Sequence, residues 1–426
     1  MFITRLPIRR HFVSTAKSSL AAEHEAITVF GRSYEKDSMT NLTPGIMERL
    51  YQQKPLNNPG HPLTQLWQRI ARHMASMHNI SQATFPSLNC PIVSVQENFD
   101  DLCFPGSHLG RSPSDSYYIN RRQMLRTHMT VHEREAMIRG WKRFLLVGDV
   151  WRRDEIDRTH YPVFHQVEGV ALYNLSMDMN NLQKHLRSEN VLSLSPQIEQ
   201  ALISQDLQGG HDPLFSRMLV ADMIHILEQL IRSLLPNSVF RWTASYFPFT
   251  QPSFELEIQN GKDWLEVLGC GLLQDSVIPI QTKGQSQGWA FGLGLERLAM
   301  LLHDIPDIRL FWNQDPRFLS QFSSSLTEWP QIFKPYSRHP PICRDVSFYI
   351  KRDWAPADLN DLARNTAGDL IESLQEIDRF QKDGRTSLTY RLTYRAADRT
   401  LTDEQVNVLQ EKLRQDLVSS LNVTLR

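Results

Sequence analysis

The chain has 426 residues, 46 basic and 47 acidic side chains, and a formal net charge of −1. This length accommodates two or three domains with sizeable hydrophobic cores. The charge balance excludes a protein that binds nucleic acid over its whole surface, so an RNA site would be a local patch. The 4 scattered cysteines exclude a disulfide-rich fold and indicate a reducing compartment without a structural zinc site.

The N-terminal segment is basic and rich in hydroxyl side chains. Its basic residues are Arg5, Arg9, Arg10 and Lys17. This composition is typical of a mitochondrial transit peptide, so we expect residues 1–20 to direct the protein to the mitochondrial matrix and residues 21–55 to form an N-terminal extension. A disordered basic tail is the alternative, because Pro7 interrupts the amphipathic helix of an import signal. No apolar run approaches the ~20 residues of a membrane span, which predicts a soluble protein.

Residues 56–325 are predicted to form a catalytic domain, because the glycine-rich and aromatic motifs all fall there among alternating strand-like and helical segments. Residues 175–235 read mostly as helix. An apolar stripe with a period near 3.6 precedes Pro236, and it comprises Leu219, Met223, Ile226, Leu227, Leu230 and Ile231. This stripe is interpreted as core rather than as a cofactor site.

A proline-punctuated segment, residues 326–340, is predicted to be a linker, since it has no periodicity. The remainder, residues 341–426, follows the order strand, helix, strand, strand, helix, strand. Pro356 suits the start of the first helix, and Thr402 with Gln405 forms a capping box for the second. The prediction is a ferredoxin-like βαββαβ domain.

The uncovered sheet face of this domain is a candidate RNA-binding surface, because cations lie beside an aromatic side chain. Its polar residues are Ser347, Tyr349, Arg391, Thr393 and Arg395, of which Tyr349, Arg391 and Arg395 are the tRNA-binding candidates. Lys382 and Arg385 in the preceding loop are weaker candidates. A solvated strand face is the alternative interpretation.

Two motifs carry the chemistry. GDVWRRDEIDRTHYPVFHQVEG, residues 148–169, predicts a hairpin whose side chains converge on a ligand, although Arg152 among acids could also be a weak surface ion pair. GWAFGLGLERLAM, residues 288–300, predicts an extended segment that leads into a helix bearing Arg297. Glycines beside an arginine at a helix start would let a polyphosphate approach, although small residues at such a place are commonly there for packing.

Together these segments resemble motifs 2 and 3 of class II aminoacyl-tRNA synthetases, and THYPVFHQVEG and GWAFGLGLERLAM are typical of the phenylalanyl-tRNA synthetases of the single-chain mitochondrial type. SYFPFTQPSFELEI, DWLEVLGCGLL and YINRRQMLRTHMTVHE extend the resemblance, and NNPGHPL is similar to a degenerate motif 1. Residues 334–426 resemble the ferredoxin-fold anticodon-binding domain. The implied α+β fold is an antiparallel sheet flanked by helices, followed by that domain.

The resemblance implies an ATP-dependent attachment of L-phenylalanine to tRNA(Phe) through an adenylate. Arg152 would bind the α-phosphate of ATP and Arg297 the γ-phosphate, which makes these two arginines the catalytic candidates. Glu266 is the candidate for holding Mg²⁺ against the phosphates. Lysine should replace either arginine poorly, because it lacks the planar fork.

The resemblance also implies a phenylalanine pocket. Phe247 and Phe249 lie two residues apart in an expected strand and would pack on the ring of the substrate. The alternative is that both are ordinary core residues, which is the usual case for an FxF pattern. Gln166 and Glu168 would bind the amino group, and His128 and Thr130 would line the same pocket. Ala290 would close its far end. His128 and His132 form an HxxxH pair, but a third metal ligand at motif spacing is missing.

The single chain combines a catalytic core and an anticodon-type domain, so we expect a monomer without a second subunit. No segment remains for an editing domain, which leads us to expect that mischarged Tyr-tRNA is not cleared. Two rival functions stay open: another class II specificity, and an inactive relative that only binds RNA. Phe247 and Phe249 with Ala290 argue against the first, and Arg152, Gln166, Glu168 and Arg297 argue against the second.

Overall fold

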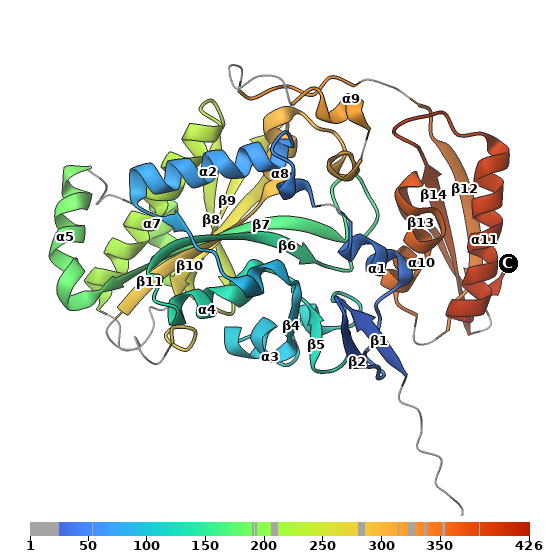
Figure 1. Cartoon of the computed structure of the whole chain (residues 1–426), viewed down its shortest axis with the longest axis horizontal. Coiled ribbons are helices and arrows are strands. Elements are labelled where there is room, and N and C mark those ends of the chain that lie inside the picture. The colour runs from blue at the N-terminus through green and yellow to red at the C-terminus, as the bar shows by residue number, and fades with distance from the viewer. Residues whose placement is uncertain are drawn as a thin grey trace, which may run out of the picture.

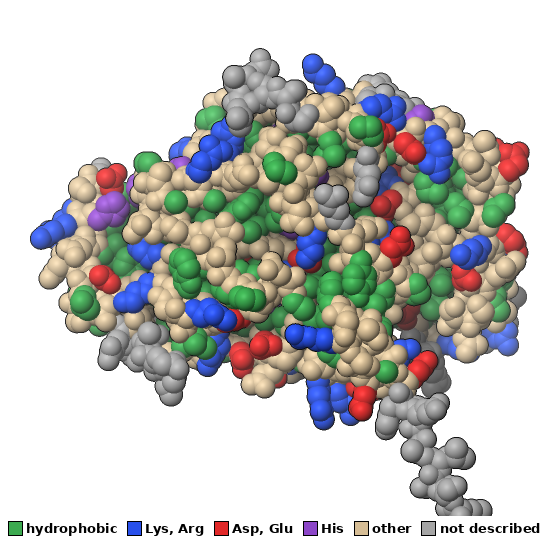
Figure 2. Space-filling view, in the orientation of Figure 1, with side chains coloured by type: hydrophobic (Ala, Val, Ile, Leu, Met, Phe, Trp, Pro, Cys, Tyr) green, Lys and Arg blue, Asp and Glu red, His purple; other side chains and the backbone are tan. Residues whose placement is uncertain are grey.

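The computed structural model describes residues 25–52, 54–189, 191, 194–205, 212–279, 286–313, 315–322, 329–335, 339–351, 354–382 and 384–426. The expected transit peptide, residues 1–20, lies outside this part of the chain. A larger body is built on a long twisted sheet, and a smaller C-terminal body lies beside one end of it (Figure 1). Cationic and anionic side chains are interspersed on the face drawn in Figure 2, in keeping with the balanced charge.

The larger body contains a 7-stranded sheet in which all neighbours are antiparallel except β3 and β6. In spatial order its strands are β3 (Ser81–Gln82), β6 (Arg143–Trp151), β7 (Val163–Asn174), β11 (Ser286–Gly294), β10 (Asp263–Leu273), β9 (Thr250–Asn260) and β8 (Phe240–Phe247). The predicted hairpin is present, since β6 pairs with β7 from Arg143↔Ala171 to Trp151↔Val163. The antiparallel sheet confirms the predicted fold class of this body.

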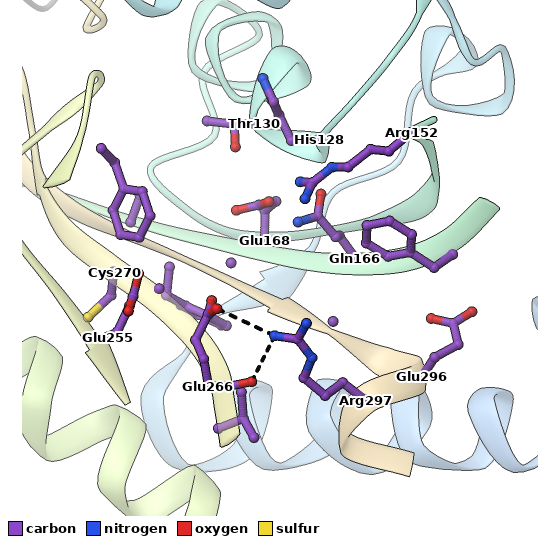
Figure 3. A pocket seen from close by; sticks show the side chains of 18 of the residues that line it. His128, Thr130, Arg152, Gln166, Glu168, Glu255, Glu266, Cys270, Glu296 and Arg297 are labelled. Atoms are coloured by element: carbon purple, nitrogen blue, oxygen red, sulfur yellow. Dashed lines mark hydrogen bonds and ion pairs between the residues drawn. The ribbon is translucent and has the colours of Figure 1, made fainter. Parts of the chain in front are cut away.

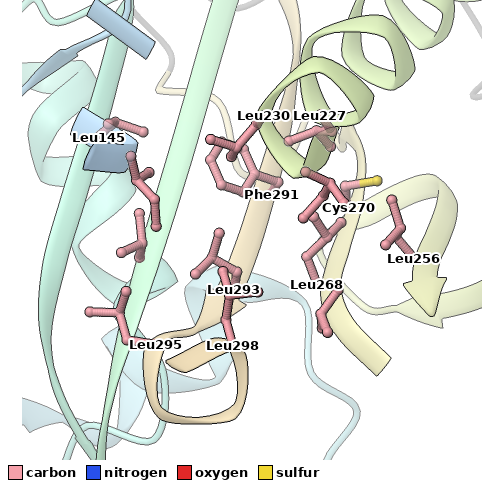
Figure 4. Close-up of a cluster of buried hydrophobic side chains, with 14 of the residues drawn as sticks. Leu145, Leu227, Leu230, Leu256, Leu268, Cys270, Phe291, Leu293, Leu295 and Leu298 are labelled. Atoms are coloured by element: carbon pink, nitrogen blue, oxygen red, sulfur yellow. The ribbon is translucent and has the colours of Figure 1, made fainter. Parts of the chain in front are cut away.

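Three helices cover one face of the sheet: α2 (Pro62–His78), α7 (Pro213–Leu234) and α8 (Leu295–His303). The segment predicted to be mostly helical forms α7 together with α5 (Leu175–Ser188) and α6 (Pro196–Ser204). Asp212 caps α7, and the whole predicted apolar stripe of that helix is buried. Leucines of α7 and α8 pack on those of the sheet in one core (Figure 4), so the interpretation of the stripe as core is confirmed.

The opposite face of the sheet carries shorter elements and stays partly open. These elements are α3 (Val95–Asn98), α4 (Glu133–Ile138), the pair β4 (Ile92–Ser94) and β5 (Gln123–Leu125), and the 3₁₀ turn η5 (Met129–His132). Because side chains alternate along a strand, Val167 faces the core while Gln166 and Glu168 face this open side. The arrangement places polar side chains of central strands in a cavity rather than in the core.

The C-terminal body has the predicted βαββαβ order. Its elements are β12 (Ile342–Tyr349), α10 (Pro356–Ala367), β13 (Ile371–Lys382), β14 (Arg385–Tyr394), α11 (Asp403–Leu421) and β15 (Thr424–Leu425). The sheet order is β13-β14-β12-β15, with antiparallel neighbours. Pro356 opens α10, and both hydrogen bonds of the Thr402–Gln405 capping box are present. The predicted ferredoxin-like fold is confirmed.

The N-terminal extension lies against both bodies. It contains the hairpin β1 (Ala26–Val29) with β2 (Arg32–Glu35), followed by α1 (Pro44–Leu50). The backbone N–H of Gly45 donates to Asn365 Oδ1 of α10 at 2.8 Å, and Arg49 forms a 2.7 Å ion pair with Asp369. The extension therefore helps to hold the C-terminal body in place.

Residues 329–335, the longer described part of the expected linker, pack on the larger body after the short helix α9 (Pro316–Leu319). The guanidinium of Arg69 lies 4.1 Å from the ring centroid of Trp329. The N–H of Phe333 donates to the carbonyl of His303 at 2.7 Å, and the Phe333 ring is buried. These contacts tie this segment to α2 and α8.

Candidate active site

The open face of the sheet contains a cavity of about 460 Å³. All ten residues proposed for ATP and phenylalanine line it: His128, Thr130, Arg152, Gln166, Glu168, Phe247, Phe249, Glu266, Ala290 and Arg297. They come from separate segments between residues 128 and 297, and Figure 3 shows the polar ones, among them Arg152, Glu168 and Arg297, around one space. The fold thus brings the two candidate arginines and the aromatic pair together.

Arg152 follows β6 directly, at the start of the loop that joins β6 to β7. Its Nε donates to the carbonyl of Thr127 at 3.0 Å, and its guanidinium lies 5.2 Å from the ring centroid of Phe164. Burial lowers the pKa of Arg152, while the nearby carboxylates of Asp154, Glu266 and Glu168 oppose that shift. The alternative of a surface ion pair does not hold, because the guanidinium is directed into the cavity (Figure 3).

Arg297 stands in the first turn of α8, where β11 runs into the helix as predicted. Its Nη1 donates to the carbonyl of Glu266 at 3.0 Å and lies 3.4 Å from the carboxylate of the same residue. About 42% of its side chain is exposed, so the guanidinium is accessible to an anion. Gly292 on β11 leaves room for the carboxylate of Glu168, because a Cβ there would lie 2.6 Å from Glu168 Oε2.

Two residues that the sequence did not single out connect these motifs. His165 on β7 is buried, and its Nδ1 lies 2.7 Å from Oε1 of Glu296 on α8. Its backbone N–H donates to Oε2 of Glu296 at 2.8 Å, and its ring stacks on Trp312. Glu296 adjoins Arg297 and lines the cavity. The pair holds the strand of Gln166 and Glu168 against the helix of Arg297.

The aromatic side of the cavity differs from the prediction in one respect. The expectation that Phe247 and Phe249 share a strand is wrong, because β8 ends at Phe247 and Phe249 lies in the turn before β9. Their rings are nevertheless nearly parallel, with centroids 6.0 Å apart, because the turn containing Pro248 returns the chain to the same side. Phe247 lies across Gly269, where a Cβ would approach its ring to 2.6 Å.

Phe104, which the sequence did not identify, continues this aromatic wall. Its ring stacks on His128 with centroids 5.5 Å apart and lies 6.0 Å from Phe249. Ala290, buried in β11, lines the same cavity. The combination is a flat, apolar slot of the shape that a phenyl ring fills.

The polar end of the cavity contains Gln166, Glu168 and Thr130. The N–H of Met129 donates to Gln166 Oε1 at 3.2 Å. Burial raises the pKa of the Glu168 carboxyl, whereas a hydrogen bond from Thr130 and the charge of Arg152 act in the opposite direction. These groups supply acceptors for an ammonium group close to the aromatic slot.

Behind Glu168 lies a second buried carboxyl that the sequence did not identify. Glu133 follows Thr130 by three residues across η5 and α4, which puts both on one side of that turn. Glu133 is fully buried, and neither of its oxygens has a hydrogen-bond partner among the described residues. Burial and the neighbouring Glu168 raise the pKa of Glu133.

The two histidines of the HxxxH pair have different surroundings. Burial lowers the pKa of His128 to about 3, against a hydrogen bond with the backbone of Asn98, so its ring is neutral. His132 Nε2 lies 2.9 Å from Nη1 of the buried Arg126, which itself pairs with Asp149. That contact places a guanidinium cation at His132, which disfavours a metal ion shared by the two histidines.

A second carboxylate, that of Glu255, lines the cavity near Glu266 on the adjacent strands β9 and β10. Burial raises the pKa of Glu266, Arg297 lowers it, and Glu255 raises it further. No cluster of three or more metal-binding side chains occurs in the described residues. One or two carboxylates beside a phosphate site fit Mg²⁺, which takes its other ligands from water and phosphate.

The candidate RNA-binding residues lie on the C-terminal body, outside this cavity. Arg391 makes a bidentate pair with Asp345, with both distances 2.8 Å. Arg395 lies 3.3 Å from Glu372 and is partly buried, while Tyr349 ends β12 and is partly exposed. Both guanidinium groups thus have a carboxylate partner on the same domain.

Residues 49–190 and 216–322 match the family of tRNA synthetase class II core domains (F), and residues 337–426 match the ferredoxin-fold anticodon-binding domain. A chloroplastic and mitochondrial phenylalanine–tRNA ligase of Arabidopsis thaliana is 40% identical, over 92% of this chain and 84% of its own. The mitochondrial ligase of Mus musculus is 38% identical over 94% and 89%. The chain belongs to the phenylalanine–tRNA ligase family.

The mitochondrial phenylalanine–tRNA ligase of Saccharomyces cerevisiae is 36% identical over the full length of both chains, so the shared family extends through both bodies. Membership of a class II phenylalanine–tRNA ligase family agrees with the ATP-using chemistry expected from the sequence. No helix among the described residues has the length and apolar character needed to cross a membrane.

Proposed function

We propose that this protein attaches L-phenylalanine to tRNA(Phe) in the mitochondrial matrix, through a phenylalanyl-adenylate formed from ATP. The observation that supports this most is that Arg152 and Arg297 share one cavity with an apolar aromatic slot and a carboxylate end. An aromatic amino acid and a triphosphate have complementary groups there. Relatives named as mitochondrial ligases and the basic, hydroxyl-rich residues 1–20 support the location.

In the first step the carboxylate of phenylalanine attacks the α-phosphorus of ATP, and pyrophosphate leaves. Arg152 binds the α-phosphate, where its fixed positive charge stabilises the transition state. Arg297 holds the γ-phosphate and keeps the nucleotide bent. Glu266, aided by Glu255, would hold Mg²⁺ beside the phosphates, where the ion would offset their charge.

Phenylalanine is positioned by its two ends. Phe247, Phe249 and Phe104 pack on its ring, and Ala290 limits the space beyond the para carbon. Glu168 and Gln166 bind the ammonium group, with Thr130 fixing the Glu168 carboxylate and His128 forming a neutral wall. Orientation of the carboxylate towards the α-phosphate then supplies the proximity on which the reaction depends.

In the second step the tRNA must reach both bodies. Tyr349, Arg391 and Arg395 on the C-terminal sheet are the proposed RNA contacts. Each of the two arginines exchanges its carboxylate partner for a phosphate of the RNA.

Because one chain contains the catalytic body and the anticodon-type body, the protein acts as a monomer. Gel filtration with light scattering tests this, and a stable dimer would contradict it.

The decisive experiment is amino-acid-dependent ATP–pyrophosphate exchange, followed by aminoacylation of organellar tRNA. Phenylalanine should support both reactions, and Arg152→Ala should reduce kcat of exchange by about 10²- to 10³-fold, as removal of a preorganised transition-state donor does elsewhere. Exchange with a different amino acid but not with phenylalanine would overturn the proposal in favour of another class II specificity.

A further inference from the structure

The loop between β6 and β7, residues 152–162, contacts both bodies of the protein. Five of its residues line the cavity: Arg152, Asp154, Thr159, His160 and Tyr161. Three side chains interleaved with these, those of Arg153, Ile156 and Arg158, contact the C-terminal body instead. The C-terminal body therefore contacts the same short segment that presents Arg152 to the cavity.

The first anchor is the residue next to Arg152. Arg153 Nε lies 2.7 Å from Asp361 Oδ2, and its Nη2 lies 2.7 Å from Asp358 Oδ1, both on α10. Arg153 and Asp361 are almost fully buried, and Asp361 also accepts from the hydroxyl of Tyr117 at 2.9 Å. An arginine that is buried and bonded to two carboxylates fixes geometry more strongly than an exposed ion pair does.

The second anchor holds the backbone of the loop. Arg364 Nη2 on α10 donates to the carbonyls of Asp154 and Glu155, each at 2.7 Å. The N–H of Leu374 on β13 donates to the carbonyl of Ile156 at 3.1 Å. The Ile156 side chain is itself buried in the hydrophobic core of the C-terminal body. The tip of the loop is thus packed as part of that body.

The third anchor lies on the returning half of the loop. Arg158 pairs with Glu372 at 3.1 Å, and Arg309 and Arg395 surround the same buried carboxylate at 3.7 and 3.3 Å. The hydroxyl of Tyr161 donates to Asp369 at 3.0 Å. Tyr161 and its neighbour His160 also line the cavity. The C-terminal body therefore holds the returning half of the loop through a residue of the site itself.

We propose that the C-terminal body is a structural part of the ATP site, with Arg364, Asp361 and Glu372 acting as positioning residues for the Arg152 loop. Without the C-terminal body this eleven-residue loop would keep contacts with the larger body, such as the backbone hydrogen bonds of Arg153 with Asp115 and of Arg158 with Ile308, but its tip would lose its anchors. The tip would then sample more conformations, and ordering it on ATP binding would weaken that binding. The contacts with α10 and β13 supply this order beforehand. Formation of the adenylate, a step without tRNA, therefore depends on the anticodon-type body.

This inference rests on the proposed function, and the test separates the two. ATP–pyrophosphate exchange is measured without tRNA on the full-length protein and on the variants Arg364→Ala and Glu372→Gln. The matched control is Asp345→Asn, which breaks an ion pair of the same body with Arg391, away from the loop. Both variants should raise KM for ATP on the order of tenfold, because small misplacements of a catalytic group are costly, while KM for phenylalanine changes less than about twofold.

Asp345→Asn should behave as the wild type. Glu372→Gln keeps the shape of the side chain, so it decides the question if Arg364→Ala proves unstable in a thermal melt. A folded Glu372→Gln variant with an unchanged KM for ATP would overturn the inference while leaving the proposed function intact. Absence of phenylalanine-dependent exchange in the wild-type protein would instead overturn the proposed function.

Discussion

His165 and Glu296 join the two motifs of the cavity: the Nδ1 of His165 lies 2.7 Å from Oε1 of Glu296 between β7 and α8. The second oxygen of Glu296 accepts the backbone N–H of His165, so both carboxylate oxygens are used. Since Arg297 adjoins Glu296 and Gln166 adjoins His165, this contact sets the distance between Arg297 and the strand that carries the proposed ammonium-binding residues.

Glu296→Ala should therefore destabilise the protein and weaken ATP binding together. The change leaves the imidazole and a backbone N–H of His165 buried without partners, and each such group costs roughly 1–3 kcal/mol. Thermal unfolding should show a lowered Tm, and pyrophosphate exchange a raised KM for ATP. Glu411→Ala, at an exposed position of α11, is the control and should change neither quantity. An unchanged Tm for Glu296→Ala would show that the pair is not structural.

Arg152→Lys should reduce kcat/KM of phenylalanine activation on the order of a hundredfold, because an ammonium group cannot match the planar, bidentate contact with a phosphate. Lysine also loses the hydrogen bond from Nε to Thr127 and the stacking over Phe164. Arg241→Lys serves as control, since Arg241 stacks over Trp264 outside the cavity. Activity of Arg152→Lys within a factor of about two of the wild type would remove Arg152 from the proposed role.

Ala290→Gly should enlarge the slot and admit phenylalanine analogues with a para substituent. Ala290 is only 3% exposed and lines the cavity, so the removed methyl group adds space inside the site. Pyrophosphate exchange with para-substituted analogues should rise relative to exchange with phenylalanine. Ala244→Gly makes the same change at an exposed position of β8 and should have no such effect. Equal analogue use by both variants would mean that the ring lies elsewhere.

The wild-type protein should also activate tyrosine at a detectable rate. An apolar slot rejects an added hydroxyl by only about a hundredfold, because the hydroxyl need not lose every hydrogen bond. Preformed Tyr-tRNA(Phe) should persist when incubated with the protein, since the two parts of the chain that match known families are a synthetase core and an anticodon-binding domain. Rapid deacylation in that assay would reveal a hydrolytic site that the sequence did not disclose.

Binding of phenylalanine should depend on pH through Glu168 and Glu133. Both carboxyls have raised pKa values in the folded protein, mainly because of burial, so the folded state binds their protons more tightly than the unfolded state does. Raising the pH from the usual pKa range of carboxyl groups through the raised pKa of the folded state therefore lowers the free energy of unfolding. The same rise in pH ionises Glu168, whose negative charge attracts the ammonium group of phenylalanine. The KM for phenylalanine should therefore fall over the same pH interval.

Glu133→Gln tests which carboxyl controls this profile, since it removes one of the two carboxyls and keeps its size. The charge of Glu168 raises the pKa of Glu133, so Glu133 is still protonated while Glu168 ionises. Glutamine then replaces a neutral carboxyl, so the midpoint of the KM profile should stay at the pH of the wild type. A midpoint that moves to lower pH would show that Glu133 is charged when Glu168 titrates.

Local signals in the sequence were sufficient for the elements that carry the site. Two extended stretches around a polar, charged turn predicted the β6–β7 hairpin, and glycines before a helical pattern predicted β11 and α8. The order of strand and helix signals, with Pro356 and a capping box, predicted the ferredoxin-like body. Each of these signals lies within one contiguous segment, where hydrogen bonding and side-chain spacing act over a few residues. Phe249 shows the limit of that reasoning, because a two-residue spacing cannot distinguish a strand from the turn that follows it.

The sequence by itself determined which residue types stand beside Arg152, Gln166 and Arg297, and hence the family and the chemistry. Only the tertiary structure decided that His165 meets Glu296, that Glu133 lies behind Glu168, and that Arg153 turns away from the cavity to Asp361. These partners are brought together by packing of whole elements, and burial makes each contact strong. Such long-range contacts have no characteristic spacing along the chain, so no pattern in the sequence could predict them.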